Sequence, residues 1–255
     1  MTAFLLIHGI PGSSATWNGV STLLREHHDV LVPDLLGFGA ETIPDVPDAL
    51  LAPNQARHLL EVLDHAGVDQ VVVVGHDFGG PVAAHLVAAA PERVAALALF
   101  ATNAFPDTPI PFPLSTLKLP FVGVVAERLL FSRPSLAMMV RRGVGRPRQR
   151  FDLDRYIGDA RRQATIATIF ATSLRRLREL YTPVEAALRS ATVPAIVGWG
   201  DRDPFFPLSV GQRTADLLPH AQFRLYEGAG HFLPDERPVQ LAADLLELAA
   251  LTTSR

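Results

Sequence analysis

The chain alternates between short apolar runs and longer amphipathic stretches. The apolar runs are rich in Val, Leu and Ile, which is typical of strands buried on both faces of a parallel sheet. Helical stretches separate them, and this alternation predicts an α/β fold with right-handed crossover connections. We predict six parallel strands: Ala3–Ile7, Val30–Pro33, Val71–Val74, Val94–Ala101, Ala195–Trp199 and Gln222–Tyr226.

Helices are indicated where apolar residues recur at helical spacing. Ile43–Pro53 is rich in Pro and Asp and is predicted to be a loop, and Asn54 is expected to cap the helix that follows, which ends at Gly67. The other helices predicted around the sheet are Thr16–His27, an Ala-rich helix that stops before Pro91, Leu208–Leu218 and Pro238–Leu251.

The alternation breaks between residues 102 and 189. This segment opens with four Pro residues and contains no strand-like Val/Ile run except Val122–Val125. From Arg128 to Arg189 it carries fourteen Arg against five acidic residues, an excess more typical of a solvated face than of an anion site. We interpret residues 102–189 as a helical cap inserted into a core made of residues 1–101 and 190–255.

Composition narrows the class of protein. A chain of 255 residues with 48% hydrophobic residues and a mean hydropathy of +0.21 can bury a large core. The net charge of −3 gives no reason to expect nucleic acid, and no apolar run approaches the length of a membrane span. Because Phe4–Ile7 is too short for the core of a signal peptide, we expect a cytoplasmic protein.

Cysteine and metal chemistry are not expected. The chain has no Cys, which excludes disulfides, thiolate nucleophiles and Cys-ligated metals. The pair His27–His28 is a poor metal site, because adjacent side chains on a helix diverge. We therefore predict no metal and no cofactor, and the sequence pattern sets no oligomeric state.

Three polar side chains follow the carboxyl ends of predicted strands. Asp77 lies in GHDFG (residues 75–79), a sharp turn into a helix, and Asp203 and His231 lie in two later turns. The carboxyl ends of parallel strands meet at one edge of a sheet, where open α/β folds bind ligands. Two simpler interpretations remain open: Asp77 as a helix N-cap, and Asp201 in place of Asp203 as the acidic residue.

Together these motifs resemble the α/β-hydrolase family along the whole chain. GHDFG has the form of the nucleophile elbow, G-x-S-x-G, with Asp in place of Ser. HGIPG (residues 8–12) resembles the oxyanion loop, GDRDPFFP (200–207) the turn with the acid, and GAGHFLPDERP (228–238) the turn with the histidine. The resemblance implies a nucleophile, an acid, a base and two backbone N–H donors for an oxyanion: Asp77, Asp203, His231, Ile10 and Phe78. It also implies a structural role for His8 in supporting the oxyanion loop.

An Asp nucleophile implies different chemistry from Ser. A Ser hydroxyl needs a base, whereas a carboxylate with an ordinary pKa of about 4 is already ionised at neutral pH. A carboxylate can displace a leaving group from saturated carbon and form an alkyl ester, whereas its attack on an ester would give a reactive anhydride. Asp77 therefore indicates epoxide opening or dehalogenation. His231 would then activate water against the Asp77 ester, and Asp203 would fix the tautomer of His231.

The leaving atom distinguishes the two reactions. Haloalkane dehalogenases typically hold halide with a Trp after the nucleophile and a second donor, but Phe78 and Ile10 occupy those places, and Phe has no N–H. Epoxide hydrolases usually protonate the ring oxygen with two cap Tyr, and their HGxP form matches HGIPG. Tyr156 and Tyr181 are the candidate cap acids. We predict an epoxide hydrolase; the alternatives are a dehalogenase and a non-hydrolytic ligand receptor or lyase.

The predicted partners are a small hydrophobic substrate and water. The pocket is expected between Asp77 and the cap, with an apolar lining and few polar anchors. Pro11, Phe170 and the Phe105–Phe112 stretch, Phe105 in particular, are the residues expected to line it.

Overall fold

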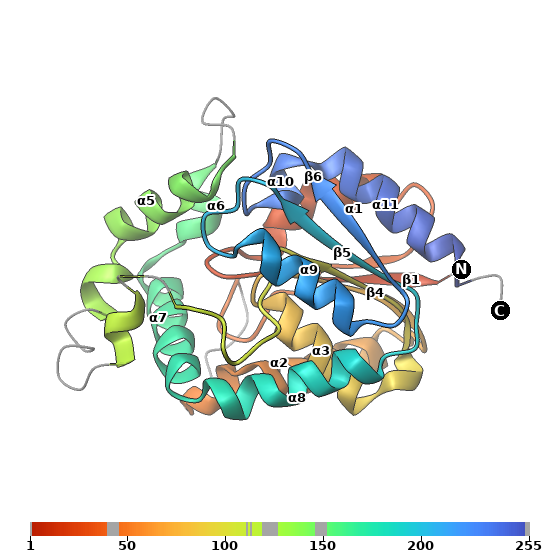
Figure 1. Cartoon of the computed structure of the whole chain (residues 1–255), viewed down its shortest axis with the longest axis horizontal. Helices are drawn as coiled ribbons and strands as arrows, with labels where there is room; N and C mark the ends of the chain where they lie inside the picture. The colour runs from red at the N-terminus through yellow and green to blue at the C-terminus, as the bar shows by residue number, and fades with distance from the viewer. Residues whose placement is uncertain are drawn as a thin grey trace.

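All six predicted strands form and pair into one parallel sheet, with the order β2-β1-β3-β4-β5-β6 (Figure 1). The computed structural model describes residues 2–39, 46–110, 112, 114–118, 127–145 and 152–252. The strands are β1 (Ala3–Ile7), β2 (Val30–Leu31), β3 (Val71–His76), β4 (Val94–Phe100), β5 (Ala195–Gly200) and β6 (Ala221–Tyr226). β2 stops before Pro33, whose missing N–H cannot join a ladder.

The sheet is buried on both faces, which explains its continuous apolar strands. On one face, Phe4, Leu6 and Val72 pack in a cluster with helices α1 (Asn18–Leu24) and α11 (Pro238–Ala250). The other face packs in a second cluster, whose helices include α2 (Ala52–His65), α3 (Gly79–Ala89), α8 (Leu177–Ser190) and α9 (Leu208–Leu217). Figure 1 shows α1 and α11 together on one side and α2, α3 and α8 on the other.

Two predicted helix starts are corrected by the structure. The stretch Thr16–His27 divides into a 3-10 turn, η1 (Ser14–Trp17), and α1, which ends at Leu24. Asn54 does not cap α2; the helix begins at Ala52 after Leu51, because Pro53 in the first turn needs no N–H partner there. The Asn54 amide donates instead to the Asp48 carbonyl at 2.7 Å, and the segment before α2 contains a further 3-10 turn, η2 (Pro47–Leu50). Gly67 follows the end of α2 with a φ of +64°, as predicted for a terminating glycine.

Helices make up much of the described part of the segment between β4 and β5, as the sequence predicts. They include the 3-10 turn η4 (Leu114–Lys118), α5 (Arg133–Gly143), α6 (Leu153–Ile157), α7 (Ala160–Arg175) and α8. The run Val122–Val125 lies outside the described residues. Val184 and Leu188 of α8 belong to the core cluster on the sheet. The last helix of the inserted region therefore packs against the core.

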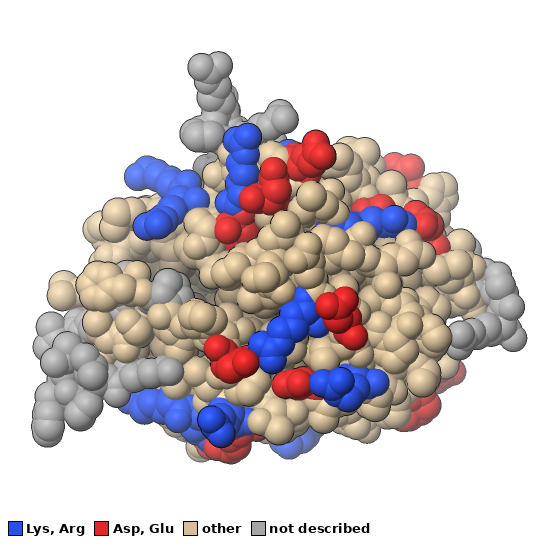
Figure 2. All heavy atoms as spheres, viewed as in Figure 1, with Lys and Arg blue, Asp and Glu red and all other residues tan. Residues whose placement is uncertain are grey.

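Among the described residues of the inserted segment, Arg133, Arg155, Arg176 and Arg189 form ion pairs with acidic side chains. Arg155 pairs with Asp235, and Arg176 pairs with both Asp48 and Glu179. Figure 2 shows Lys and Arg beside Asp and Glu across the visible face rather than in one basic field. These contacts agree with a solvated, ion-paired surface. In the part of the chain that the structure describes, no helix is both long and apolar enough to cross a bilayer.

Two further short elements lie among the described residues. They are the 3-10 turn η3 (Pro91–Arg93) before β4 and α10 (Leu233–Glu236), which begins two residues after His231 and leads into α11. Because every strand runs in the same direction, the segments after β1, β3, β4, β5 and β6 meet at one edge of the sheet. This edge carries the candidate site.

Candidate active site

Asp77 stands on a strained turn between β3 and α3. Its φ of +52° lies in the left-handed region, which Asp tolerates better than most side chains. Its N–H donates to the Phe100 carbonyl at 3.1 Å, and the Thr102 hydroxyl donates to its carbonyl at 2.5 Å. A Cβ at Gly80 would lie 2.0 Å from the Thr102 hydroxyl oxygen, so the turn closes only with glycine there. The surroundings thus hold Asp77 in its unusual backbone conformation.

The carboxylate of Asp77 does not cap the helix. The N-cap of α3 is Phe78, while Oδ1 of Asp77 accepts a hydrogen bond from the backbone N–H of Ile10 at 2.9 Å. Oδ2 lies 3.4 Å from Nε2 of His231. Burial raises the pKa of Asp77, but His231 and the Ile10 N–H outweigh burial, and the net pKa is below the ordinary value. The two oxygens therefore have different neighbours, and the group is held ionised.

The loop that carries Ile10 is fixed by His8. Nδ1–H of His8 donates to the Gly9 carbonyl at 2.9 Å, and Nε2 accepts the Leu35 N–H at 3.1 Å. Burial lowers the pKa of His8 to about 4, which keeps the ring neutral and consistent with one donor and one acceptor nitrogen. Phe78 directly follows Asp77 and lines a cavity together with Ile10 and Tyr181. Its role as a second N–H donor stays a prediction.

His231 is held between two carboxylates. Its Nδ1–H donates to Oδ2 of Asp203 at 2.9 Å, and Oδ1 of Asp203 accepts the N–H groups of Phe205 and Phe206. Asp201, the other candidate, is exposed and accepts the Gly228 N–H instead. Burial lowers the pKa of His231, but the charges of Asp203 and Asp77 outweigh burial and raise it to about 10.

His76, inside the elbow itself, is a supporting residue that sequence reasoning missed. Its Nε2–H donates to the carbonyl of His231 at 2.9 Å, and its ring lies edge-on to Trp17. Burial lowers the pKa of His76 to about 4, so it is a neutral donor at physiological pH. His76, the residue before Asp77, thus fixes the backbone of His231. Its position inside the GHDFG motif was the sequence feature that could have identified it.

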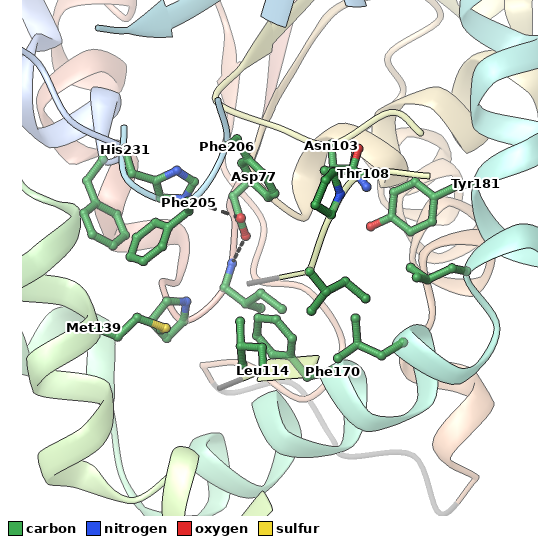
Figure 3. A pocket seen from close by; sticks show the side chains of 17 residues that line it. Asp77, Asn103, Thr108, Leu114, Met139, Phe170, Tyr181, Phe205, Phe206 and His231 are labelled. Carbon is green, nitrogen blue, oxygen red and sulfur yellow. Dashed lines mark hydrogen bonds and ion pairs between the residues drawn. The ribbon is translucent and has the colours of Figure 1, made fainter. Parts of the chain in front are cut away.

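A largely apolar pocket opens in front of Asp77 and His231. It holds about 790 Å³ of empty space, part of which is open to solvent. In Figure 3, Asp77 and His231 come from the sheet edge, while Phe170 lies opposite and Tyr181 stands to one side. The apolar lining comprises Ile10, Pro11, Pro109, Ile110, Leu114, Met139, Phe170, Leu174, Leu177, Phe205, Phe206 and Phe232. Pro11 and Phe170 therefore lie where the sequence predicted them.

Two predicted lining positions are corrected. Phe105 is buried away from the pocket, with the Arg213 guanidinium 3.6 Å above its ring centre. Phe112, at the end of the same stretch, is 82% exposed. An aromatic run in a Pro-rich loop carries no period that says which side chains turn inward.

Of the two candidate cap tyrosines, only Tyr181 lines the pocket. Tyr156 does not line the pocket; its buried hydroxyl donates to Asp235, and its ring packs edge-to-face on Phe232 at 4.6 Å between centroids. The prediction that Tyr156 faces the substrate is therefore wrong. Tyr181 does line the pocket, together with Asp77. Burial and the charge of Asp77 raise the pKa of Tyr181 above its ordinary value, which keeps the phenol protonated.

Asn103 is a polar pocket residue that the sequence did not indicate, and its partner Thr108 lines the pocket within the predicted Phe105–Phe112 stretch. The Asn103 amide donates to the Phe105 carbonyl at 2.9 Å, and its oxygen accepts the Thr108 hydroxyl at 2.5 Å. Asn103 also lies beside the Tyr181 phenol (Figure 3), and this contact partly offsets the rise in the pKa of Tyr181. Asn103 follows the carboxyl end of β4, and that position was the signal that could have identified it.

The fold and the site define a hydrolase with an Asp in the nucleophile elbow. The chain matches the alpha/beta hydrolase fold family over residues 2–238, and it belongs to that family. An uncharacterized protein of Mycobacterium tuberculosis (strain ATCC 25618 / H37Rv) is 29% identical over 262 residues, which cover 98% of this chain and 76% of that protein.

Relatives with named activities include both predicted classes. Epoxide hydrolase A of Mycobacterium tuberculosis (strain ATCC 25618 / H37Rv) is 26% identical over 292 residues, covering 95% of this chain and 88% of that protein. The crystal structure of haloalkane dehalogenase DbeA from Bradyrhizobium elkani superposes with a TM-score of 0.84 at 20% identity, covering 100% of this chain and 92% of that chain. The similarity to this dehalogenase structure shows that the two proteins share a fold.

Proposed function

We propose that this protein opens a small hydrophobic epoxide to a diol through an ester with Asp77. The observation that carries the proposal is the pair of environments around the Asp77 carboxylate. Oδ1 is held by the Ile10 N–H, whereas Oδ2 lies 3.4 Å from Nε2 of His231, and the Asp77 side chain lines the pocket. An ionised carboxylate in this position is a nucleophile toward saturated carbon without help from a base.

The first step is displacement at a ring carbon. Oδ2 of Asp77 forms a C–O bond to that carbon as the ring C–O bond breaks, and the ring oxygen takes a proton from the Tyr181 phenol. The pocket gives this step an apolar environment, with Asn103 beside the phenol. The proposed cap, residues 102–189, supplies Met139, Phe170 and Tyr181 to the site, so the inserted segment would select the substrate.

The second step is hydrolysis of the ester. Alkylation removes the negative charge of Asp77, which is one of the two charges that raise the pKa of His231. The ring can then give up its proton, which returns through solvent to the phenolate that the first step left at Tyr181. The neutral ring accepts a proton from water, while Asp203 keeps the imidazole oriented. Hydroxide adds to the ester carbon, the charge forms on Oδ1, and the Ile10 N–H stabilises it. As the ester C–O bond breaks, the alkoxide takes the proton of the added hydroxyl group and leaves as the diol, which returns Asp77 to a carboxylate beside protonated His231.

Isotope transfer tests this route. In a single turnover in ¹⁸O-labelled water, the second oxygen of the diol comes from Asp77, so the first diol should be unlabelled and the label should appear in the peptide that contains Asp77. Label in the first-turnover diol, with none in the peptide, would show direct attack by water and would contradict the covalent route.

A dehalogenase remains the second candidate because the Tyr181 hydroxyl lines the pocket and could donate to halide. The two Trp residues of the chain, Trp17 and Trp199, are fully buried and do not line the pocket, so they cannot hold a leaving halide. A phenol close to Asp77 suits an alkoxide, which needs a proton, better than it suits halide, which does not. We therefore place epoxide opening first.

Replacing Tyr181 by Phe is expected to slow formation of the Asp77 ester from an epoxide by about 10²–10⁴-fold, the usual contribution of a general acid. Tyr156→Phe is the matched control, because Tyr156 binds Asp235 outside the pocket and should affect stability more than this step. The rate is measured by rapid quench and intact mass in the His231→Ala background. An unchanged rate in Tyr181→Phe would remove Tyr181 from the mechanism.

The two steps should respond differently to acid. Because the pKa of Asp77 is lowered in the protein, ester formation should persist at acidic pH and be lost only as the pH falls through that lowered value. Hydrolysis needs neutral His231 in the ester. As the solution is acidified, hydrolysis should therefore stop before ester formation does, and the ester should accumulate. Intact mass at steady state across pH measures this; an ester fraction independent of pH would contradict the assigned role of His231.

A further inference from the structure

Glu236 is a buried carboxylate for which the proposed reaction has no direct use. It ends α10, five residues after His231, and its side chain is 3% exposed. Among the described residues, the hydrogen-bond donors to its side chain are three backbone N–H groups. They belong to Gly145 at 2.9 Å, Gly230 at 3.0 Å and Phe232 at 3.2 Å. Burying a carboxylate is costly unless such bonds compensate it, so this arrangement is specific.

Two of the three donors to Glu236 flank His231 in the chain. Gly230 and Phe232 are the residues on either side of His231, so the carboxylate holds both flanks of the histidine. Gly145 lies two residues beyond the end of α5, in the inserted segment. Glu236 therefore ties the histidine turn to the helical region that supplies Met139 to the pocket.

The backbones that Glu236 joins are in direct contact. The N–H of His231 donates to the Gly143 carbonyl at 2.7 Å. A Cβ at Gly145 would lie 2.4 Å from the Gly230 nitrogen, and one at Gly230 would lie 2.1 Å from the Gly143 carbonyl oxygen. Both positions therefore need glycine for this approach. His76 holds the carbonyl of His231 from the other side at 2.9 Å.

We infer that Glu236 is a positioning residue that aligns His231 for hydrolysis of the Asp77 ester, by fixing residues 230–232 against residues 143–145. The inference rests on the proposed function, in which His231 activates water. Ester formation depends less on Glu236, because Oδ1 of Asp77 is fixed by Ile10, outside the histidine turn. A displacement of His231 by about 1 Å would slow hydrolysis on the order of 10²-fold.

The test uses the full chain with Glu236→Gln, Glu236→Asp and, as a matched control, Asp201→Asn. The Gln amide has one acceptor oxygen, so at least one buried N–H faces a donor in place of an acceptor. Asp201 also accepts one backbone N–H, that of Gly228, but it is exposed and bonds to neither flank of His231. Circular dichroism and melting curves establish which variants fold, and if Glu236→Gln does not, the shorter Glu236→Asp decides.

With an epoxide such as styrene oxide, Glu236→Gln should accumulate the ester seen by intact mass, because hydrolysis slows about 10–10²-fold while ester formation changes much less. Glu236→Asp should restore part of the rate, and Asp201→Asn should stay within about twofold of the wild type. Equal slowing of both steps, or no ester accumulation in a folded variant, would overturn the inference.

A second readout does not depend on substrate. The Nδ1 proton between His231 and Asp203 should give a far-downfield proton NMR signal, which is assigned by its loss in His231→Ala. In Glu236→Gln this signal should shift or broaden, and in Asp201→Asn it should not. An unchanged signal in folded Glu236→Gln would overturn the positioning role. Absence of any ester in the wild type and in His231→Ala would instead contradict the proposed function, and the NMR result would still decide the role of Glu236.

Discussion

Replacing Asp77 by Asn should abolish ester formation and reduce turnover by about 10⁴-fold or more, as loss of a covalent nucleophile does in other enzymes. The neutral amide has no charged oxygen to attack saturated carbon. The fold should survive, because Asn tolerates a left-handed backbone and its oxygen can still accept the Ile10 N–H. The loss would therefore be chemical rather than structural.

The measurement for Asp77→Asn is diol production and intact mass with a panel of epoxides, alongside a melting curve. Wild-type protein and Asp201→Asn serve as the references, since Asp201 is an exposed carboxylate outside the pocket. Substantial diol formation by folded Asp77→Asn would show that Asp77 is not the nucleophile, and water attack assisted by His231 would then take its place.

Replacing His231 by Ala should trap the ester. Ester formation continues because Asp77 attacks without a base, whereas hydrolysis should slow by about 10²–10⁴-fold when its general base is removed. His231 also counteracts the effect of burial on the pKa of Asp77, so this variant should be compared with the wild type at mildly alkaline pH, where the carboxylate stays ionised. The variant should accumulate a stable adduct.

The mass of the adduct distinguishes the two candidate reactions. A gain equal to the whole epoxide, absent in a variant that also carries Asp77→Asn, would support the epoxide route. A gain equal to an alkyl fragment without its halogen would support dehalogenation. Absence of an adduct with every compound, together with an inactive wild type, would favour the ligand receptor or lyase alternative and contradict both hydrolytic routes.

The strands and the order of the site motifs could be predicted from sequence because their signals are local. Val71–Val74 is a continuous apolar run followed by a glycine-rich turn, and both properties follow from neighbouring residues. Asp77, Asp203 and His231 each follow a predicted strand, so parallel pairing alone was enough to bring them to one edge. Their distances in the structure, 2.9 Å and 3.4 Å, agree with that expectation.

The inserted segment could not be predicted at the same depth. Tyr156 and Tyr181 both lie in helical patterns, and nothing near either residue says that one hydroxyl meets Asp235 while the other enters the pocket. Phe105 lies in a loop and was misplaced because its position depends on a distant partner, Arg213, on a helix beyond β5. A helical period gives the buried face of a helix, but it does not identify the surface that covers that face.

The sequence by itself determined the parallel sheet, the sharp turn at Asp77 and the order in which Asp77, Asp203 and His231 follow their strands, because apolar runs, glycines and motif spacing act over a few residues. Only the tertiary structure decided which tyrosine faces Asp77, how Asn103 enters the pocket and why Glu236 is buried. Gly145 and Glu236 are separated by 91 positions in the chain, yet their hydrogen bond holds the histidine turn. Such contacts depend on how packed elements meet, and that geometry is fixed by the whole core rather than by any local pattern.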